Sequence, residues 1–285
     1  MHAKTVSFIN FKGGVGKTVS AVNIAGFLAS EFNKKTLLVD IDPQANATLH
    51  LMKEDKYQDE GGNLKIKTLY DVFEKYKSSS KPGVNLKDII LENPVEKGPP
   101  SIIKLHLVPS DLRLIDADRE FTSDIKAVML KKELEELTSD YDYILIDCPP
   151  NLSLLTRNAL FASEYCIIPL IPDFLSTTGL RLLLKKLKEI GSEYKNIGKE
   201  PTEVKGVLFT RVQFQTSLHK QRMEEVKDYL TEKNIPYFKN FIRNLIGVQE
   251  AAYMHLPLCC YSKGKDAAED YRNVTKEFVE KMEGG

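Results

Sequence analysis

The stretch FKGGVGKT, residues 11–18, decides the fold that this sequence predicts. It follows an apolar run at residues 5–11 and precedes a helical pattern at residues 17–32. A glycine-rich loop between a strand and a helix is the context of a phosphate-binding loop. Glycines let backbone N–H groups converge on phosphate oxygens, and the helix N-terminus adds the positive end of its dipole. In this arrangement Lys17 reaches the β- and γ-phosphates, and the Thr18 hydroxyl suits Mg²⁺.

The loop departs from the common GxxxxGK[ST] form at its start. Phe11 stands where the first glycine is expected, and Lys12 adds a second cation beside the one that Lys17 already supplies. The candidate nucleotide-binding residues of the loop are Lys12, Gly13, Gly14, Val15, Gly16, Lys17 and Thr18.

Three aspartates follow apolar runs elsewhere in the chain. Asp40 and Asp42 lie in LLVDIDPQ, and Asp147 closes ILID. Ligands of open α/β sheets bind at the carboxyl ends of the strands, so these carboxylates are expected beside the phosphate loop. We expect Thr18, Asp40 and Asp147 to form the metal site.

Apolar runs alternate with helical patterns along almost the whole chain. Runs such as YILIDC and YCIIPLI indicate strands buried on both faces. The alternation predicts an α/β fold, a doubly wound and mostly parallel sheet with helices on both faces. Predicted strands are residues 5–11, 36–40, 105–109, 143–147, 166–171, 204–210 and 237–242. Predicted helices are residues 17–32, 68–77, 124–137, 152–162, 178–193, 218–233 and 267–282.

The chain has no linker-like break, which predicts one domain over residues 1–285. Residues 52–100 contain GGN, SSSKPG and EKGPP and are expected to form an elaborated surface connection.

The 40 basic residues cancel the 40 acidic ones, so net charge alone selects no partner. No apolar run approaches the roughly 18 residues of a membrane span. The four cysteines show no CxxC spacing, so we expect neither disulfides nor a zinc site, and a cytoplasmic protein.

Three of these motifs together resemble the deviant Walker ATPases of the ParA/MinD group: KGGVGKT (12–18), DIDPQANAT (40–48) and ILIDCPP (144–150). Residues 105–120, 168–180 and 256–278 are similar to the ParA branch in particular. The resemblance extends from residue 5 to about residue 282. It implies a P-loop NTPase fold of the deviant Walker type.

The resemblance also implies roles for individual residues. Lys12 matches the signature lysine, which in the family crosses the interface of an ATP-sandwiched dimer to contact the partner's phosphates. Asp42 matches the aspartate that positions the attacking water, so the expected catalytic residues are Lys12, Lys17 and Asp42. Thr210 and Arg211 follow the strand that borders the adenine in relatives. The implied cofactors are ATP and Mg²⁺, and the products are ADP and phosphate.

The implied partners are a second copy of the chain, non-specific double-stranded DNA and a ParB-like or other small adaptor, with the ATP form on the nucleoid. Residues 181–243 contain 14 Lys and Arg against 8 Asp and Glu, a net charge of +6, which leaves −6 on the remainder. This asymmetry predicts a DNA-binding face in the C-terminal half. The candidates are Lys185, Lys186, Lys188, Lys220, Arg222, Lys227, Lys239 and Arg243.

Other functions on the same scaffold stay open from the residues alone. The cargo is expected to be a plasmid or chromosome, or else a protein body such as a carboxysome or chemoreceptor cluster. A membrane-cycling regulator like MinD needs a basic amphipathic terminal helix, whereas residues 267–285 are net acidic. The nitrogenase iron protein needs cluster-ligating cysteines, and Cys148 has no suitably placed second cysteine. Dethiobiotin synthetase is another metabolic enzyme on this scaffold, and ATPase activity stimulated by DNA would separate the ParA class from it.

Replacing Lys17 with alanine is expected to abolish ATP binding, because the loop then lacks its own cation against the β- and γ-phosphates. Isothermal titration calorimetry measures this affinity directly. An affinity near that of the wild type would show that the loop is not the nucleotide site.

Overall fold

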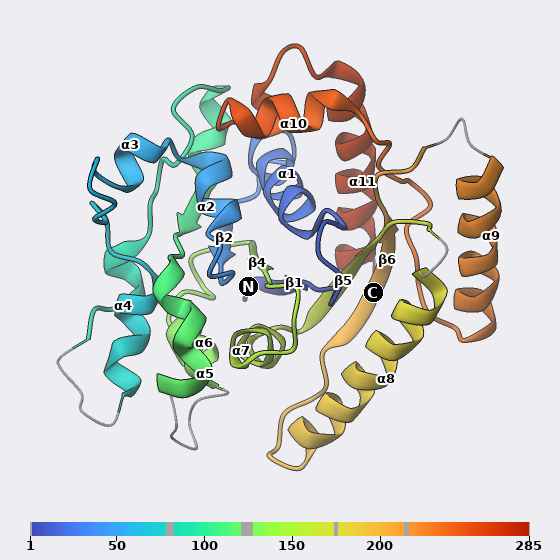
Figure 1. The fold of residues 1–285 in the computed structure, drawn as a ribbon, viewed down its shortest axis with the longest axis horizontal. Helices are drawn as coiled ribbons and strands as arrows, with labels where there is room; N and C mark the ends of the chain where they lie inside the picture. The colour runs from blue at the N-terminus through green and yellow to red at the C-terminus, as the bar shows by residue number, and fades with distance from the viewer. Residues whose placement is uncertain (1, 78–82, 121–127, 174–175, 214–216, 285) are drawn as a thin grey trace.

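The structure is a computed structural model that describes residues 2–77, 83–120, 128–173, 176–213 and 217–284. Its centre is a six-stranded parallel sheet in the order β3-β2-β4-β1-β5-β6 (Figure 1). The predicted α/β class and doubly wound sheet are therefore confirmed. The strands are β1 (Lys4–Phe8), β2 (Thr36–Asp40), β3 (Leu105–Val108), β4 (Tyr143–Asp147), β5 (Tyr165–Leu170) and β6 (Glu203–Phe209).

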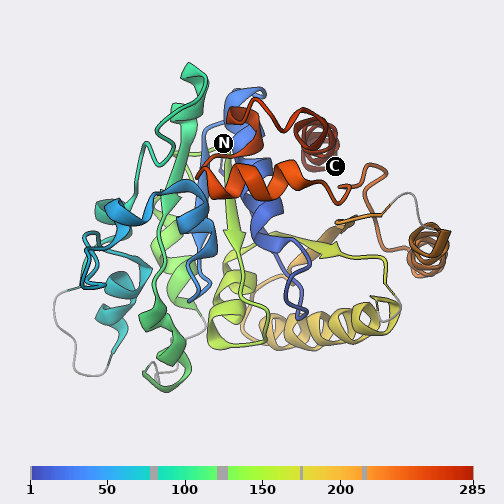
Figure 2. The same ribbon diagram turned by 45° about the horizontal axis from the view of Figure 1, so that its top comes forward.

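Helices cover both faces of the sheet because successive strand residues point to opposite sides and both sides are apolar. Figure 2 shows α1, α10 and α11 on one side and α6, α7 and α8 on the other. The longer helices are α1 (Lys17–Ser30), α7 (Leu154–Ala162), α8 (Ser176–Lys195), α9 (Ser217–Glu232), α10 (Ile246–Tyr253) and α11 (Lys265–Glu283). The shorter ones are α2 (Asn46–Leu51), α3 (Glu54–Tyr57), α4 (Leu69–Phe73), α5 (Ala117–Glu120) and α6 (Met129–Glu135).

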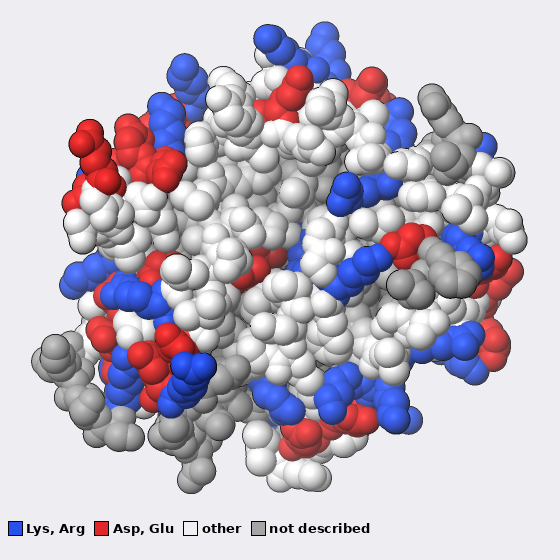
Figure 3. Space-filling view, in the orientation of Figure 1, with Lys and Arg blue, Asp and Glu red and all other residues white. Residues whose placement is uncertain are grey.

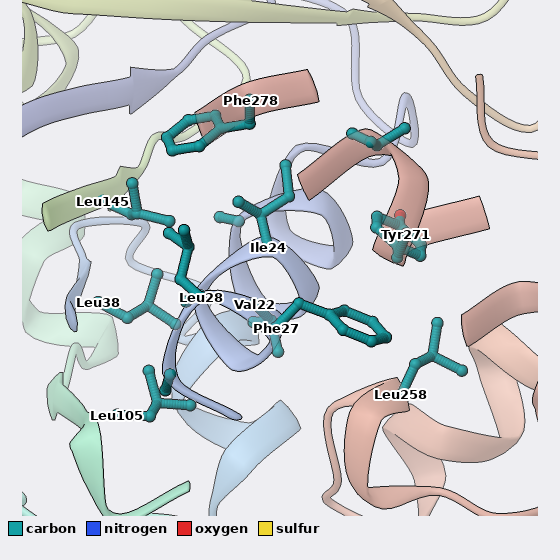
Figure 4. Packing of buried hydrophobic residues seen from close by; sticks show 14 of the residues in the cluster. Val22, Ile24, Phe27, Leu28, Leu38, Leu105, Leu145, Leu258, Tyr271 and Phe278 are labelled. Carbon is teal, nitrogen blue, oxygen red and sulfur yellow. The ribbon is translucent and has the colours of Figure 1, made fainter. Parts of the chain in front are cut away.

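Helix α1 is buried along most of its length in this core. Its side chains lie between the strands and α11: Figure 4 shows Leu28 on the side of Leu38 and Leu145, and Phe27 on the side of Leu258 and Tyr271. All six of these side chains are buried. Complete burial of one aromatic or leucine side chain contributes about 1.5–3 kcal/mol, so this packing fixes the helix that follows the phosphate loop.

The register of the central strands brings the predicted site together. Strand β4 lies between β1 and β2, with Phe8 and Asp40 both paired with Asp147. Because all three strands are parallel, their carboxyl ends meet at one edge of the sheet. The loop that follows β1 therefore lies beside both Asp40 and Asp147.

The predicted strand at residues 237–242 is wrong. This segment runs alongside β6 but forms only an isolated bridge between Tyr237 and Val207. The backbone N–H groups of Lys239 and Asn240 instead donate to the buried carboxylate of Glu277, at 2.8 and 2.9 Å. Since a side chain on α11 takes these donors, no regular ladder forms.

Helix α10 is absent from the sequence-based prediction. A glycine near its start, Gly247, is unfavourable in a helix and weakened the pattern. In the structure this glycine permits close packing, since a Cβ there would lie 3.0 Å from the Cα of Gly264. The helix predicted at residues 68–77 begins as expected, with a capping box between Thr68 and Asp71, but its last turn is a 3₁₀ helix, η1 (Glu74–Tyr76). Of the helix predicted at 124–137, residues 124–127 lie outside the described residues, and α6 covers residues 129–135.

The expected connection at residues 52–100 contains α3, α4 and three short 3₁₀ helices: η1, η2 (Leu86–Ile89) and the start of η3 (Pro100–Lys104). Leu69, Val72 and Phe73 of α4 bury against the same sheet face as α6 and α7. This part of the chain is therefore more regular and more buried than its turn-rich sequence suggests. Within the described parts of the chain, every helix is too short or too polar to cross a bilayer.

Gly26 of α1 provides a test of this packing. A Cβ at Gly26 would lie 2.8 Å from Cβ of Pro257 and 3.1 Å from Sγ of Cys259. We expect Gly26→Ala to lower the free energy of unfolding by about 1–3 kcal/mol, because overpacking outweighs the gain in helix propensity.

The matched control is Gly179→Ala on α8, where an added Cβ meets nothing within 4 Å. This variant is expected to gain up to about 1 kcal/mol. Urea unfolding of both variants measures the difference. Equal stability of the two variants would contradict the close contact at Gly26.

Candidate functional site

The loop between β1 and α1 has the backbone shape of a phosphate cradle. Gly14 and Gly16 have φ angles of 73° and 83°, in the left-handed region that favours glycine. Gly16 is the N-cap of α1, and no side chain caps the helix at this end. The first N–H groups of α1 therefore face the loop without side-chain acceptors, as an anion site requires.

The two lysines of the loop point to different places. Lys17 is buried, with 7% of its surface exposed, and its Nζ donates to the carbonyl oxygen of Lys12 at 3.3 Å. Burial lowers the pKa of Lys17, and the charge of Asp147 opposes this shift. The side chain of Lys12 is exposed and forms an ion pair with Asp173, which follows β5. Only Lys17 therefore lies inside its own loop.

Asp40 is held by donors from the chain itself. One carboxylate oxygen accepts from both the backbone N–H and the hydroxyl of Thr48 at 2.8 Å, and the other accepts from the N–H of Asp42 at 3.1 Å. Burial raises the pKa of Asp40 to about 7, although the hydrogen bonds from Thr48 act in the opposite direction. With these donors in place, Asp40 ties the end of β2 to α2.

Asp147 is the buried carboxylate without a partner. Neither of its oxygens accepts a hydrogen bond that meets normal geometry, and both are inaccessible to solvent. Burial raises its pKa well above the ordinary value, and the nearby charge of Asp40 adds to the shift. An unpaired buried carboxylate is costly unless a cation compensates it. Together with the hydroxyl of Thr18, this orphaned oxygen pair fits a hard divalent cation such as Mg²⁺.

Asp42 lies in the wall of the cavity above the loop. It is almost buried, and it accepts a hydrogen bond from the N–H of Gln44 at 2.9 Å. Burial raises its pKa, while that hydrogen bond and the charge of Lys17 lower it. The hydroxyl of Ser110, which follows β3, donates to the backbone carbonyl of Asp42 at 2.7 Å and fixes the segment that carries Asp42.

The end of β6 holds the phosphate loop directly. The hydroxyl of Thr210 donates to the carbonyl of Val15 at 2.7 Å, and Nη1 of Arg211 donates to the carbonyl of Gly14 at 2.9 Å. Arg211 has a φ of 51°, an uncommon conformation for a residue with a side chain. The sequence predicted both residues near the nucleotide, and in the structure both side chains contact carbonyl groups of the phosphate loop.

A cavity of about 600 Å³ opens above the loop. Figure 3 shows that the centre of this face is hollowed and mostly uncharged. One whole wall of the cavity is formed by residues 242–252, which carry no sequence motif. The lining residues that the sequence did not predict are Val19, Gln44, Asn46, Leu49, His50, Pro150, Ile242, Asn244, Leu245, Val248, Gln249, Ala252 and Tyr271.

The predicted DNA-binding residues fall into two groups. Those of α8 and α9 lie on one flank of the molecule, since these helices pack together and the Arg181 guanidinium lies 4.7 Å from the centre of the Tyr229 ring. Figure 3 shows basic and acidic side chains intermixed over α8. Lys185 and Lys188 of α8 and Lys220 of α9 are exposed, and so is Lys239, which follows α9. Lys186, Arg222 and Lys227 form ion pairs with Glu189, Glu225 and Glu224.

Arg243 lies apart from that flank. It is at the rim of the cavity and is bound to the Asp270 carboxylate, at 2.8 Å from Nη2 to Oδ1. Its backbone N–H donates to the same carboxylate at 2.9 Å. This arginine is therefore fixed to α11 and borders the cavity.

Comparison with known proteins agrees with this geometry. Residues 3–198 match a family model described as an AAA domain. The chain is 35% identical over 279 residues to the sporulation initiation inhibitor protein Soj of Bacillus subtilis, covering 97% of this chain and 98% of the relative. It is 32% identical over 277 residues to the chromosome-partitioning ATPase Soj of Treponema pallidum, covering 97% of both chains. The chain belongs to the ParA/Soj family of partition ATPases.

A solved structure supports the same assignment. A plasmid partition protein of Borrelia burgdorferi, described as bound to AMPPNP, superimposes with a TM-score of 0.73 and 25% sequence identity. The match covers 98% of this chain and 99% of that one. The parallel sheet and its surrounding helices are thus shared over almost the whole length.

A buried histidine in the cavity wall is expected to make this ParA/Soj protein less stable in acid. Nε2 of His50 lies 3.1 Å from the carbonyl of Leu256, and burial lowers the pKa of His50 to about 4. As the pH falls below 6.5, the unfolded chain takes up a proton that the folded chain does not. We expect this residue to cost about 2 kcal/mol of stability by pH 5. Chemical denaturation at pH 7.5 and pH 5 of wild type and His50→Gln measures the effect, and the variant should lose less.

Replacing the exposed His2 with glutamine serves as the control and should leave the pH dependence unchanged. If His50→Gln and the wild type lose stability equally between the two pH values, then His50 is not the source of the acid sensitivity.

Proposed function

We propose that residues 1–285 form one ParA-type ATPase domain that binds ATP with Mg²⁺, dimerises around it and binds DNA without sequence preference. An adaptor protein then stimulates hydrolysis to ADP and phosphate, and the cycle partitions a plasmid or chromosome. The observation that carries the proposal is the placement of Lys12, whose ammonium group lies outside its own phosphate loop. The relatives named as partition proteins support the choice of cargo.

Within one subunit, the loop and α1 account for nucleotide binding. The free N–H groups of α1 and the buried Lys17 are suited to the β- and γ-phosphates. Thr18 and Asp147 are placed to hold Mg²⁺, directly or through water, and the bound ion would neutralise phosphate charge. Asp40 fits this role less well, because its oxygens already accept three hydrogen bonds.

Lys12 is explained by a second subunit. Asp173 binds its ammonium group in the single chain, and that side chain is about half exposed. A cation that a second active site recruits must be accessible in the monomer and must lack a role in its own site. Lys12 meets both conditions, so it is suited to contact the partner's phosphates when two chains enclose ATP.

Asp42 is proposed to orient the attacking water. It lies in the cavity wall close enough to the charge of Lys17 for that charge to lower its pKa. Its backbone is fixed by Ser110 and its carboxylate by the N–H of Gln44. A fixed carboxylate next to the phosphate site can hold a water in line without moving during the reaction.

The flank formed by α8 and α9 is proposed to contact DNA. Ion pairs on this flank leave Lys185 and Lys188 among its exposed basic side chains. One flank with so few cations binds DNA weakly, and dimerisation would place two of them side by side. ATP dependence of DNA binding follows from this requirement for two copies.

Gel-shift titrations on two unrelated duplexes, with and without ATP and Mg²⁺, test the proposal. Wild type should bind both duplexes equally and only with ATP, and its affinity should fall steeply with salt, by about 0.9 in slope per phosphate contact. Lys12→Ala should keep ATP affinity but lose both dimerisation and DNA binding. Asp42→Ala should bind DNA with ATP but release no phosphate.

The DNA-binding flank is tested by the double variant Lys185→Glu and Lys186→Glu, which should weaken binding to both duplexes while sparing basal ATP hydrolysis. Its matched control is Lys87→Glu with Lys132→Glu, the same charge change at exposed lysines of η2 and α6. Tight, salt-insensitive binding to a single sequence without ATP would overturn the proposed function. Equal loss in both double variants would remove α8 from the interface.

A further inference from the structure

Two adjacent thiols lie in η6 (Leu258–Cys260), on the far side of α1 from the sheet. Sγ of Cys259 and Sγ of Cys260 are 3.8 Å apart, and both side chains are partly exposed. The other two cysteines of the chain, Cys148 and Cys166, are fully buried. The chain therefore presents one accessible pair of sulfur atoms that point to a common space.

That space is a groove of about 590 Å³ between η6 and α11. Its wall includes Gly98, where an added Cβ would lie 2.6 Å from Sγ of Cys260. The missing side chain at Gly98 thus lets the backbone of this wall approach the sulfur closely. The charged side chains of Lys265, Glu269 and Arg272 line the groove, and Arg272 is already paired with Glu31.

The two thiols shift each other's pKa. The contact with Cys260 lowers the pKa of Cys259, and the same contact raises the pKa of Cys260. The thiolate is the form of cysteine that attacks and binds soft centres. Either sulfur can attack first, and the other, 3.8 Å away, supplies the second bond.

A direct disulfide between these residues is disfavoured by geometry. The Cys259–Cys260 peptide bond is trans, which places consecutive Cα atoms about 3.8 Å apart. Disulfides usually need Cα atoms about 4.4–6.8 Å apart, and shorter spans are strained. A single atom that bridges the two sulfurs avoids this constraint, because each sulfur then bonds to the bridging atom.

We propose that Cys259 and Cys260 form a two-thiol binding site for a monosubstituted trivalent arsenical. With a compound R–As=O, two As–S bonds form, the As=O bond is lost, and the oxygen leaves as water with both thiol protons. No electron is transferred. The organic group R remains on arsenic and extends into the groove.

Such a ligand suits the number of donors available. In the described residues, no group of three or more His, Cys, Asp and Glu side chains is arranged to hold a metal ion. Arsenic that already carries one carbon substituent needs only two sulfurs. The two thiols lie apart from the phosphate loop, since Cys259 packs on Gly26, roughly 13 Å along α1 from Lys17.

Titration of the full-length protein with phenylarsine oxide, followed by intact-mass spectrometry, tests the proposal. One adduct per chain is expected, with the mass of the reagent less one water. An excess of a small dithiol should remove it, whereas the same concentration of a monothiol should not. Cys259→Ser and Cys260→Ser should each weaken binding by about 100-fold or more, because bidentate binding is lost. Cys166→Ser, at a buried thiol, is the matched control and should bind like the wild type.

A second measurement on the wild type avoids any dependence on how the variants fold. Two thiols of the native protein should react with a chromogenic disulfide reagent, and phenylarsine oxide should protect both together. Protection of only one thiol, or wild-type affinity in either folded serine variant, would overturn the two-thiol site.

Discussion

The rest of the site depends on the burial of Asp147 at the end of the central strand β4. Its carboxylate is closed off from solvent and accepts no well-formed hydrogen bond, and it lies at the end of a strand that is flanked by β1 and β2. An apolar residue would be far less costly at this position. Asp147 therefore requires positive charge nearby, which Lys17 supplies in part and a bound cation would complete.

Neighbouring elements are organised around that requirement. Thr210 and Arg211 hold the phosphate loop from β6, and Asp40 holds α2 from β2. The bonds from Thr210 and Arg211 reach the phosphate loop from a part of the chain almost 200 residues away. The phosphate loop is consequently held from the end of β6 and by the buried helix α1, while the neighbouring segment after β2 is held by Asp40. This pre-organisation limits the rearrangement that ligand binding must drive.

The sequence predicted the parts of the molecule that have local patterns. Buried parallel strands are continuous apolar runs, and the glycine-rich loop has fixed spacing, so β1 to β6 and the residues of the loop follow from the sequence. The wall of the cavity formed by Leu245, Val248 and Gln249 does not, because its role arises only when α10 folds over α1. The false strand at residues 237–242 has the same origin: Glu277 lies 37 residues further along the chain and takes its donors. The position of Arg243 likewise depends on Asp270, and net charge along the sequence could not reveal this pairing.

The hydrogen bonds from Thr48 to Asp40 have a consequence for motion. They join the two ends of the segment that carries Asp42, so residues 40–48 form a closed ring rather than an open loop. A short closed ring has few accessible conformations, and the carboxylate of Asp42 can shift only as far as the ring can flex. The Asp42 carboxylate is therefore held close to the position that it has in this structure, and any group that reacts with it must approach the ring from the cavity.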